Sequence, residues 1–396
     1  MEMAGDTTRV AGRLVLVGIG LVLGLGMAEL LLRLFPSMMP AAAREWTALY
    51  PEADGETEEE GRGTSLKLMI EHPELRYLPA SQVSVIEHSE YTFTLDTSHL
   101  VFGEVGFRDD GIDGQPYAVA VGDSFVMGWG VELEETWVEL LEARTGRDIA
   151  NMGVMGSGTR KETSVLTTYG LTLQPELVLY GFFPNDVEDQ AWQIEVVEAG
   201  ATEDPLGLLQ EQMEQQHPFY RIRSFLSHNS YLYRLLGYLY YASQGEVCTY
   251  RDGQLNYTFD IAGWRRRLDF DDPSIAEAME AVLQDLEEAY RATQESGAEF
   301  VLLIFPAKEQ IYLDIITQHC AHSLPPDQFD PLMQRLDSFC QSEGIRCVDL
   351  GEAMLAAGAA TRQIYYSMDG HWNAEGNRLA ADLIYEYLEE SGLLSE

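Results

Sequence analysis

Positive charge is scarce in this chain, and lysine is nearly absent. Only three lysines occur among 396 residues, and 25 basic residues face 65 acidic ones, which leaves a formal net charge of −40. This balance argues against binding nucleic acid, or an anionic membrane surface, through a basic patch. It suits a salt-rich medium in which ions screen self-repulsion, so we hypothesise a halophilic protein whose stability rises with added salt.

Cysteine is also rare, and its spacing excludes a common class of metal and redox sites. The chain has Cys248, Cys320, Cys340 and Cys347, with no close CxxC pair to suggest zinc or redox chemistry. If all four are bridged, three pairings are open. Cys340 and Cys347 flank a predicted helix-to-strand connection, where they can bridge outside the cytoplasm; two buried free thiols are the alternative.

One long apolar run stands near the amino terminus. From Leu14 to Ala28 every residue is apolar or glycine, and after Glu29 and Arg33 the stretch reaches Phe35. About 21 residues of this kind are enough to span a bilayer. Glu29 and Arg33 have the i, i+4 spacing of one helix face, near an end from which both side chains reach the membrane interface.

This run predicts a single-pass membrane anchor over residues 1–36. Arg9 and Arg13 precede it, so the positive-inside preference favours a cytoplasmic amino terminus and an extracytoplasmic body. A cleaved signal peptide is the alternative, because Ala41-Ala42-Ala43 offers small residues to a peptidase. The anchor is favoured because the run is long and the alanines lie well beyond it.

Residues 37–114 are interpreted as a linker followed by a β-rich lead-in to the main domain. Residues 37–64 include the acidic run 56–60 and predict a solvated linker. The stretches 83–85 and 91–95 alternate apolar and polar side chains, which predicts strands.

The remaining residues, 115–396, alternate short β-branched runs with amphipathic segments. The predicted strands are 117–121, 148–152, 177–182, 299–305 and 345–350. The predicted helices lie near 133–145, 160–173, 275–297, 327–343 and 373–391. This alternation predicts an α/β fold, in which a parallel sheet is covered by helices on both faces and reactive groups follow the carboxyl ends of the strands.

Residues from about 191 to 265 interrupt this alternation. The aromatic stretches 219–223 and 231–241 predict a helical insertion over the sheet. Two interpretations remain open: a lid that binds an apolar acyl chain, or ordinary packing of an inserted helix.

Candidate reactive residues follow the first three of the predicted strands. Ser124, in the sequence Gly-Asp-Ser, stands where a strand-to-helix turn can project its hydroxyl and aim its own amide at a developing oxyanion. Gly156 lies in a glycine-rich stretch that lets a backbone amide approach a substrate oxygen, although glycines there also suit a tight loop. Asn185 places a side-chain amide at the same sheet edge, where an Asn-Asp pair is otherwise typical of a helix cap.

A histidine with a neighbouring acid completes the set near the end of the chain. Asp369-Gly370-His371-Trp372 precedes the last predicted helix. Histidine is the side chain best suited to accept a serine proton near neutral pH, and a nearby carboxylate fixes its tautomer and stabilises the imidazolium.

These four blocks, in this order over about residues 115–392, resemble the SGNH (GDSL-like) hydrolase superfamily, named after its serine, glycine, asparagine and histidine blocks. The resemblance implies a three-layer α/β/α, flavodoxin-like fold with Ser124 as nucleophile, His371 as base and Asp369 as the acid that orients it. It also implies an oxyanion hole made by Ser124, Gly156 and Asn185, and no metal or organic cofactor.

The acid departs from the pattern of that superfamily. The usual acid lies three residues before the histidine, where this chain has Met368. The Asp-x-His-Trp spacing is instead similar to that of SGNH-like polysaccharide O-acetyltransferases. Asp369 is therefore expected either as a looser partner of His371 or as dispensable to a Ser-His dyad.

The function implied is that of a membrane-anchored extracytoplasmic serine esterase. It would act through an acyl-enzyme on acyl ester substrates, the acylated carbohydrates or lipids of the cell envelope. A polysaccharide O-acyltransferase with the same site is the first alternative. A non-catalytic envelope-binding or assembly protein that keeps the fold is the second.

Overall fold

The computed structural model describes residues 3–39, 68–72, 75–191, 226 and 229–394. Most of the predicted linker, its acidic run 56–60 and the three alanines at 41–43 lie outside the described residues. The same holds for residues 192–225 of the predicted insertion, which include the aromatic stretch 219–223.

A five-stranded parallel sheet forms the centre of the molecule, in the order β13-β12-β9-β7-β8. Its strands are β7 (Ala118–Val121), β8 (Ile149–Asn151), β9 (Leu177–Phe182), β12 (Glu299–Ile304) and β13 (Arg346–Asp349). Every residue of β7, β8 and β9 is buried, as expected for parallel strands covered on both faces. The predicted α/β fold is confirmed, and each predicted strand has a counterpart in the sheet.

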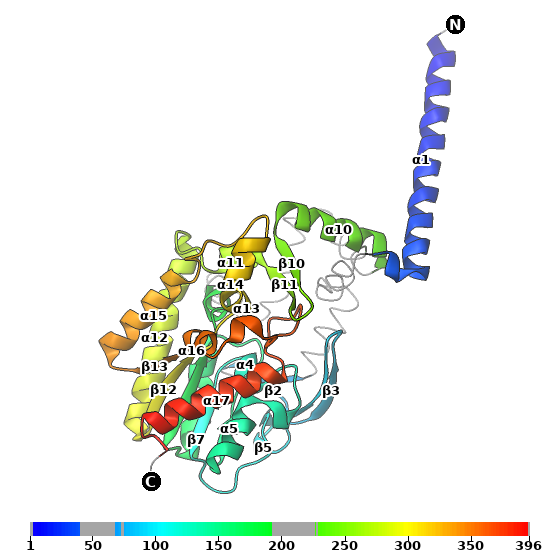
Figure 1. Ribbon diagram of the computed structural model, residues 1–396. Helices are drawn as coiled ribbons and strands as arrows, with labels where there is room; N and C mark the ends of the chain where they lie inside the picture. The colour runs from blue at the N-terminus through cyan, green and yellow to red at the C-terminus, as the bar shows by residue number, and fades with distance from the viewer. Residues whose placement is uncertain (1–2, 40–67, 73–74, 192–225, 227–228, 395–396) are drawn as a thin grey trace.

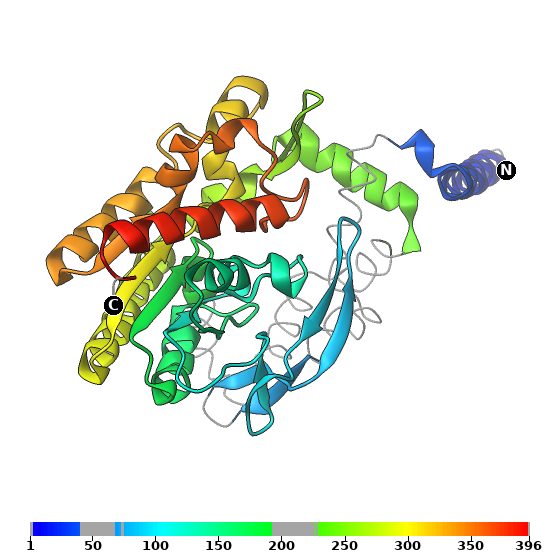
Figure 2. The same cartoon turned by 60° about the horizontal axis from the view of Figure 1, so that its bottom comes forward.

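Helices cover the two faces of the sheet. Their bounds are α5 (Trp137–Thr145), α6 (Thr159–Thr168), α12 (Pro273–Ser296), α15 (Asp330–Glu343) and α17 (Ala374–Glu390). The chain runs from β7 to the edge strand β8, and a right-handed crossover places the connecting helix α5 on one face of the sheet. From β8 the chain runs in the opposite direction, through β9 and β12 to β13, so right-handed crossovers place α6, α12 and α15 on the other face. The last helix, α17, packs beside α5, as Figure 1 and Figure 2 show.

Local signals set the ends of these helices. Asp272 caps α12 by accepting a hydrogen bond from the Ser274 amide, and Gly297 ends the helix in the left-handed conformation. Asn373 caps α17 by accepting from the amides of Glu375 and Gly376. Three short elements lie where helix was expected: α4 (Ser124–Met127), η2 (Leu133–Glu135) and η3 (Gly170–Leu173). Other short elements were not predicted: α13 (Lys308–Ile311), α14 (Leu313–His319), α16 (Leu350–Ala356), and the 3₁₀ turns η1 (Pro36–Met38) and η4 (Ala359–Thr361).

The lead-in forms three antiparallel hairpins that pack against the main domain. They pair β1 (Met69–His72) with β2 (Arg76–Pro79), β3 (Val83–Glu87) with β4 (Thr92–Asp96), and β5 (Leu100–Phe102) with β6 (Val105–Phe107). Phe93 and Leu95 of β4 share a small buried cluster with Met127 of α4. The β3–β4 hairpin is thereby fixed against the helix that begins at Ser124.

The predicted helical insertion is only partly helical. After α10 (Tyr231–Gln244), residues 247–260 form a β-hairpin of β10 (Val247–Arg251) and β11 (Asn256–Asp260), followed by α11 (Ile261–Arg267). Helix was expected because this segment is rich in aromatic residues. The hairpin is stabilised by cross-strand pairs such as Thr249 with Thr258, and by the burial of the three central residues of β11.

Two disulfide bonds cross-link the described part of the chain. Cys248 of β10 is bonded to Cys320, which follows α14, and Cys340 of α15 is bonded to Cys347 of β13. The second pairing is the one that the sequence suggested, and the first ties the inserted hairpin to the main domain. Disulfides of this kind persist in oxidising environments.

The amino-terminal helix α1 (Met3–Leu34) projects away from the sheet domain, and its carboxyl end lies beside α10 (Figure 1). Its segment Leu16–Leu34 is long and apolar enough to cross a membrane, and only 6% of that segment is buried. A membrane span and a signal sequence share these properties.

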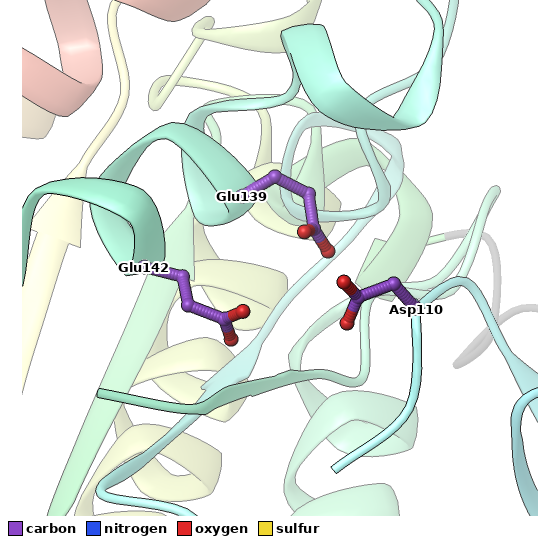
Figure 3. A group of neighbouring side chains, drawn as sticks. All are labelled: Asp110, Glu139 and Glu142. Atoms are coloured by element: carbon purple, nitrogen blue, oxygen red, sulfur yellow. The ribbon is translucent and has the colours of Figure 1, made fainter. Parts of the chain in front are cut away.

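Three carboxyl groups crowd together at the outer side of α5. Ligand oxygens of Asp110, Glu139 and Glu142 lie within 4.8 Å of one another (Figure 3). Burial, followed by the charges of neighbouring acids, raises the pKa of Glu139 to about 8. Burial also raises the pKa of Glu142 to about 7. Both groups therefore bind protons in the folded state over a pH range where the unfolded chain has released them.

We expect this crowding to make stability fall as pH rises from about 5 to about 8, because a raised carboxyl pKa means that the native state binds the extra protons. Glu139→Gln mimics the protonated form, so the fall in Tm between pH 5.5 and 8.5 should be smaller than in the wild type. Glu280→Gln, at an exposed position of α12, is the control. Equal slopes in wild type and Glu139→Gln would contradict this account.

Candidate active site

Ser124 lies where β7 passes into the short helix α4. The strand ends at Val121, and Ser124 is the first residue of α4. Asp123 caps that helix, because its side chain accepts a hydrogen bond of 2.9 Å from the Phe125 amide. The strand-to-helix turn predicted from the sequence is present, and it presents the serine hydroxyl at the carboxyl edge of the sheet.

The structure brings Ser124, His371 and Asp369 into one hydrogen-bonded chain. Oγ of Ser124 lies 2.7 Å from Nε2 of His371, and Nδ1 of His371 lies 2.5 Å from Oδ1 of Asp369. The backbone amide of His371 also donates to that carboxylate oxygen, at 2.8 Å. Asp369 thus reaches the imidazole from only two residues away, because the chain turns tightly through Gly370.

Burial and charge set the protonation of this pair. Burial by itself lowers the pKa of His371, but the Asp369 charge and hydrogen bond outweigh it and raise that pKa above its usual 6.5. Burial raises the pKa of Asp369, yet the nearby imidazole and its hydrogen bonds hold it well below the usual value. The carboxylate therefore stays ionised and favours a positive imidazole, as a base that accepts the serine proton requires.

The β3–β4 hairpin of the lead-in supplies a second set of partners to Asp369. Tyr91 donates its hydroxyl to Oδ2 of Asp369 at 2.6 Å, and Trp129 donates to the Tyr91 oxygen at 3.0 Å. The Glu90 carboxylate accepts hydrogen bonds from the amides of Met368 and Asp369. Both oxygens of Asp369 are thus occupied, and the loop that carries it is held from outside the sheet.

Lys308 is hydrogen-bonded to the same loop. Its ammonium donates to three consecutive carbonyl oxygens, of Ser367 at 3.3 Å, Met368 at 2.9 Å and Asp369 at 3.2 Å. The side chain is only 2% exposed. Burial lowers the pKa of Lys308, while the charge of Glu309 opposes that change.

Gly156 and Asn185 line the same cavity as Ser124. Gly156 has a φ of +62°, a conformation that suits glycine. One hydrogen of the Asn185 side-chain amide is engaged by Asp189, at 3.2 Å, and an amide has a second to offer. The oxyanion-hole role of Ser124, Gly156 and Asn185 stays a prediction, and the structure places all three residues in the lining of one cavity.

The cavity has a volume of about 450 Å³, and part of its wall comes from the inserted segment. Val247 of β10, Phe259 of β11 and Trp264 of α11 contribute to that wall. Acidic side chains outnumber basic ones in the lining. The acids are Asp123, Glu188, Asp189, Asp260, Glu309 and Asp369, and the bases are Arg267, Lys308 and His371.

Several of these charges are neutralised in pairs. Arg267 bonds to Glu188 at 2.5 Å and to Asp260 at 3.0 Å. Burial, with the charge of Asp123, raises the pKa of Asp189 to about 7. Burial alone is the main cause that raises the pKa of Asp123 to about 6. Among the described residues that line the cavity, acids outnumber bases, and the Arg267 guanidinium is paired with two carboxylates.

Sequence reasoning missed Tyr91, Glu90 and Lys308. Tyr91 and Glu90 belong to a hairpin far away in sequence, and a pattern along the chain gives no sign that the hairpin reaches residue 369. Lys308 did carry a signal: it is one of three lysines in the chain, and it follows the fourth strand of the sheet, where chemistry was expected.

Residues 266–396 match the family described as "SGNH hydrolase-like domain, acetyltransferase AlgX". Residues 266–396 are thus similar to an SGNH hydrolase-like domain. The matched part includes Lys308, Asp369 and His371, and it begins after Ser124. No curated protein matches the chain in sequence.

Solved structures similar to this chain include bacterial lipases and esterases. The lipase/acylhydrolase from Enterococcus faecalis has 14% identity and a TM-score of 0.34, over 69% of this chain and 95% of its own. A GDSL-like lipase from Bacteroides thetaiotaomicron has 11% identity and a TM-score of 0.36, over 69% and 88%. A psychrotrophic esterase from Pseudoalteromonas sp. has 13% identity and a TM-score of 0.35, over 69% and 97%.

We expect the imidazole of His371 to titrate above pH 6.5, and Asp369→Asn to lower its pKa because the stabilising negative charge is removed. Ring signals in NMR spectra measured against pH test this, with His371→Gln identifying the signal that belongs to His371. The remaining histidine signals show whether the substitution acts locally. A His371 pKa that is the same in wild type and Asp369→Asn would rule out the proposed coupling.

Proposed function

We propose that this protein is an extracytoplasmic serine acyl hydrolase that uses Ser124, His371 and Asp369. The observation that carries this proposal is the continuous chain of hydrogen bonds from the serine hydroxyl through the imidazole to a partly buried carboxylate. The SGNH hydrolase-like domain supports acyl ester chemistry of this kind.

The mechanism follows from the positions of the three groups. Nε2 of His371 accepts the Ser124 proton as Oγ attacks the ester carbonyl, and the developing oxyanion receives hydrogen bonds from the Ser124 and Gly156 amides and the Asn185 side chain. Collapse of this intermediate expels the alcohol, which takes the proton from His371. Water, activated by His371 in turn, then releases the acid from the acyl-serine. Asp369 stabilises the imidazolium in both steps.

A transferase that passes the acyl group to a sugar hydroxyl is the second candidate. The description of the matched family as an acetyltransferase favours it, as does the Asp-x-His-Trp spacing at residues 369–372. Both reactions share the acyl-serine, so they differ only in what attacks it. The acidic lining of the cavity favours an uncharged glycan or lipid ester over a polyanionic one, because like charges repel.

We further propose that α1 is retained as a membrane anchor. The Glu29 carboxylate accepts hydrogen bonds from the Ser230 hydroxyl at 2.9 Å and from the amides of Tyr231 and Leu232 at 3.1 and 2.9 Å. It thereby caps the start of α10. A signal peptide cleaved beyond residue 39 would remove this partner, so the contact supports the anchor.

Ser124→Ala should abolish turnover while leaving the fold intact, because it removes the attacking oxygen and little volume. Hydrolysis of p-nitrophenyl acetate by the full-length chain in nanodiscs measures turnover, and circular dichroism reports the fold. Ser338→Ala, at an exposed position of α15, is the matched control and should keep full activity. Wild-type activity in Ser124→Ala would refute the assignment of the nucleophile.

Asn185→Ala should lower kcat by a factor on the order of 10² to 10³, because one hydrogen-bond donor to the oxyanion is lost. Asn185→Asp is the informative companion, because it keeps the shape but replaces the donating amide with a carboxyl. Steady-state kinetics on the same acetyl ester provide the measurement. A change confined to KM in both variants would show that Asn185 only binds substrate.

Added glycan acceptor distinguishes hydrolysis from transfer. We expect acetate release from p-nitrophenyl acetate without an acceptor, and mass spectrometry of a neutral oligosaccharide added to the reaction shows whether it gains an acetyl group. Rapid ester consumption only when the oligosaccharide is present would favour the transferase. An oligosaccharide of uronic acids, included in parallel, should be the poorer acceptor because of the acidic lining.

A further inference from the structure

The start of helix α10 is hydrogen-bonded to the carboxyl end of the proposed membrane anchor. Besides the three hydrogen bonds that Glu29 accepts from the start of α10, Arg33 is bonded to Glu29 at 2.7 Å and also to the carbonyl oxygen of Asn229. A carboxylate at a helix amino terminus satisfies free amides and complements the helix dipole. The start of α10 is therefore held at the carboxyl end of α1.

The direction of α10 places it along the surface of a bilayer that α1 crosses. In both Figure 1 and Figure 2, α10 runs crosswise to α1, away from the carboxyl end of that helix and toward the sheet domain. A helix in this position is near the plane where acyl chains meet headgroups.

The composition of α10 differs sharply from that of the whole chain. Its 14 residues, YLYRLLGYLYYASQ, include five tyrosines and four leucines, and Arg234 is the only charged residue. The chain as a whole is 23% charged and strongly acidic. An acidic chain with one helix free of acids can approach a bilayer there without repulsion, and tyrosine is enriched at membrane interfaces.

One face of α10 exposes apolar side chains. Leu236, Leu239 and Tyr240 have the i, i+3, i+4 spacing of a single helix face, and they are 55%, 49% and 60% exposed. None of the residues of α10 is fully buried. We propose that α10 is an interfacial helix, with Leu236, Leu239 and Tyr240 inserted in the headgroup–acyl boundary of the bilayer that α1 spans.

This inference rests on the proposed anchor, and it bears on the site. Gly245 ends α10, and β10 begins two residues later at Val247, which lines the cavity beside Ser124. A docked α10 therefore fixes this part of the cavity wall close to the membrane surface, where acylated lipids or membrane-linked glycans are presented.

Depth-dependent fluorescence quenching tests the docking of α10. The full-length chain is reconstituted in phosphatidylcholine vesicles with an environment-sensitive label at Leu239→Cys, and lipids carrying a nitroxide near the headgroup are added. Leu355→Cys, an apolar position on α16 that is 43% exposed, is the matched control. We expect at least a twofold loss of fluorescence at position 239 and little change at position 355.

A label at Leu23→Cys in α1 separates the two proposals. Quenching of the label at position 23 by nitroxides deep in the acyl region, with no quenching at position 239, would keep the anchor and overturn the interfacial helix. No quenching at either position would overturn both. Quenching at 239 and 355 alike would show unspecific adsorption and would also overturn the inference.

A second inference concerns Lys308 and depends on different observations. Three donated hydrogen bonds to the carbonyls of residues 367–369 fix the backbone that presents Asp369 and His371. Among the described residues, no other side chain donates hydrogen bonds to all three of these carbonyl oxygens. We propose that Lys308 is a positioning residue that holds this loop in the geometry needed for proton transfer from Ser124.

A positive charge at position 308 also affects the groups around it. Lys308 lies 5.9 Å from the centre of the Tyr257 ring, and its charge opposes that of the imidazolium on His371. The facing acids are Glu309 on the same helix, Asp260 on β11, Glu90 on the β3–β4 hairpin and Asp369 on the loop. Removing the ammonium should therefore loosen the loop and raise the pKa of His371.

Lys308→Met keeps the apolar stem and removes the charge and the donors. We expect kcat on the acetyl ester to fall at least tenfold with KM changed less than threefold, and the acid limb of the kcat/KM profile to move to higher pH. Lys161→Met is the control, and Lys308→Gln, which keeps a donor, is the second variant in case Lys308→Met fails to fold. A folded variant of either kind with unchanged kcat and an unchanged acid limb would overturn the proposal.

Discussion

The hydrogen bond between the Asp369 carboxylate and the His371 imidazole is the interaction on which the site depends. Both groups are largely removed from water, and a buried ion is tolerated only when its hydrogen-bonding capacity is filled. Asp369 meets this demand with two donors from His371 on one oxygen and the Tyr91 hydroxyl on the other. With the imidazole fixed in this way, its second nitrogen is left to face Ser124.

Meeting that demand draws on parts of the chain that are distant in sequence. The serine comes from the edge of the parallel sheet, the histidine from the loop before the last helix, and Tyr91 from a hairpin that precedes the sheet domain. Lys308 adds hydrogen bonds to the backbone carbonyls of residues 367–369. The lead-in is therefore part of the site, although it lies outside the residues that the SGNH hydrolase-like family covers. The inserted hairpin adds Val247 and Phe259 to the lining of the cavity.

The sequence predicted well those features that local physics determines. The strands of the sheet are buried on both faces and read as short apolar runs, such as Leu177–Phe182, so their places along the chain were visible. Ser124 and His371 were found because each follows a strand or precedes a helix with recognisable caps. Asp369 was expected either as a looser partner of His371 or as dispensable to a Ser-His dyad, and its closeness to His371 depends on a turn through Gly370 that spacing alone does not reveal.

Features that depend on contacts through space were not visible in the sequence. The β10–β11 hairpin was taken for helix because aromatic residues dominate its neighbourhood. Tyr91 was assigned to a strand, but its hydroxyl partner lies 278 positions away. The disulfide from Cys248 to Cys320 was one of three open pairings, because composition does not say which cysteines meet.

Covalent labelling tests the central claim most directly, namely that Ser124 is a nucleophile activated by His371. The folded, full-length chain is treated with a fluorophosphonate, and the modified residue is identified by peptide mass spectrometry. The account predicts one phosphonylated residue, Ser124, in the wild type and greatly slowed labelling in His371→Gln. A folded wild type that remains unlabelled, or is labelled at another serine, would contradict it and leave a binding protein built on a hydrolase fold.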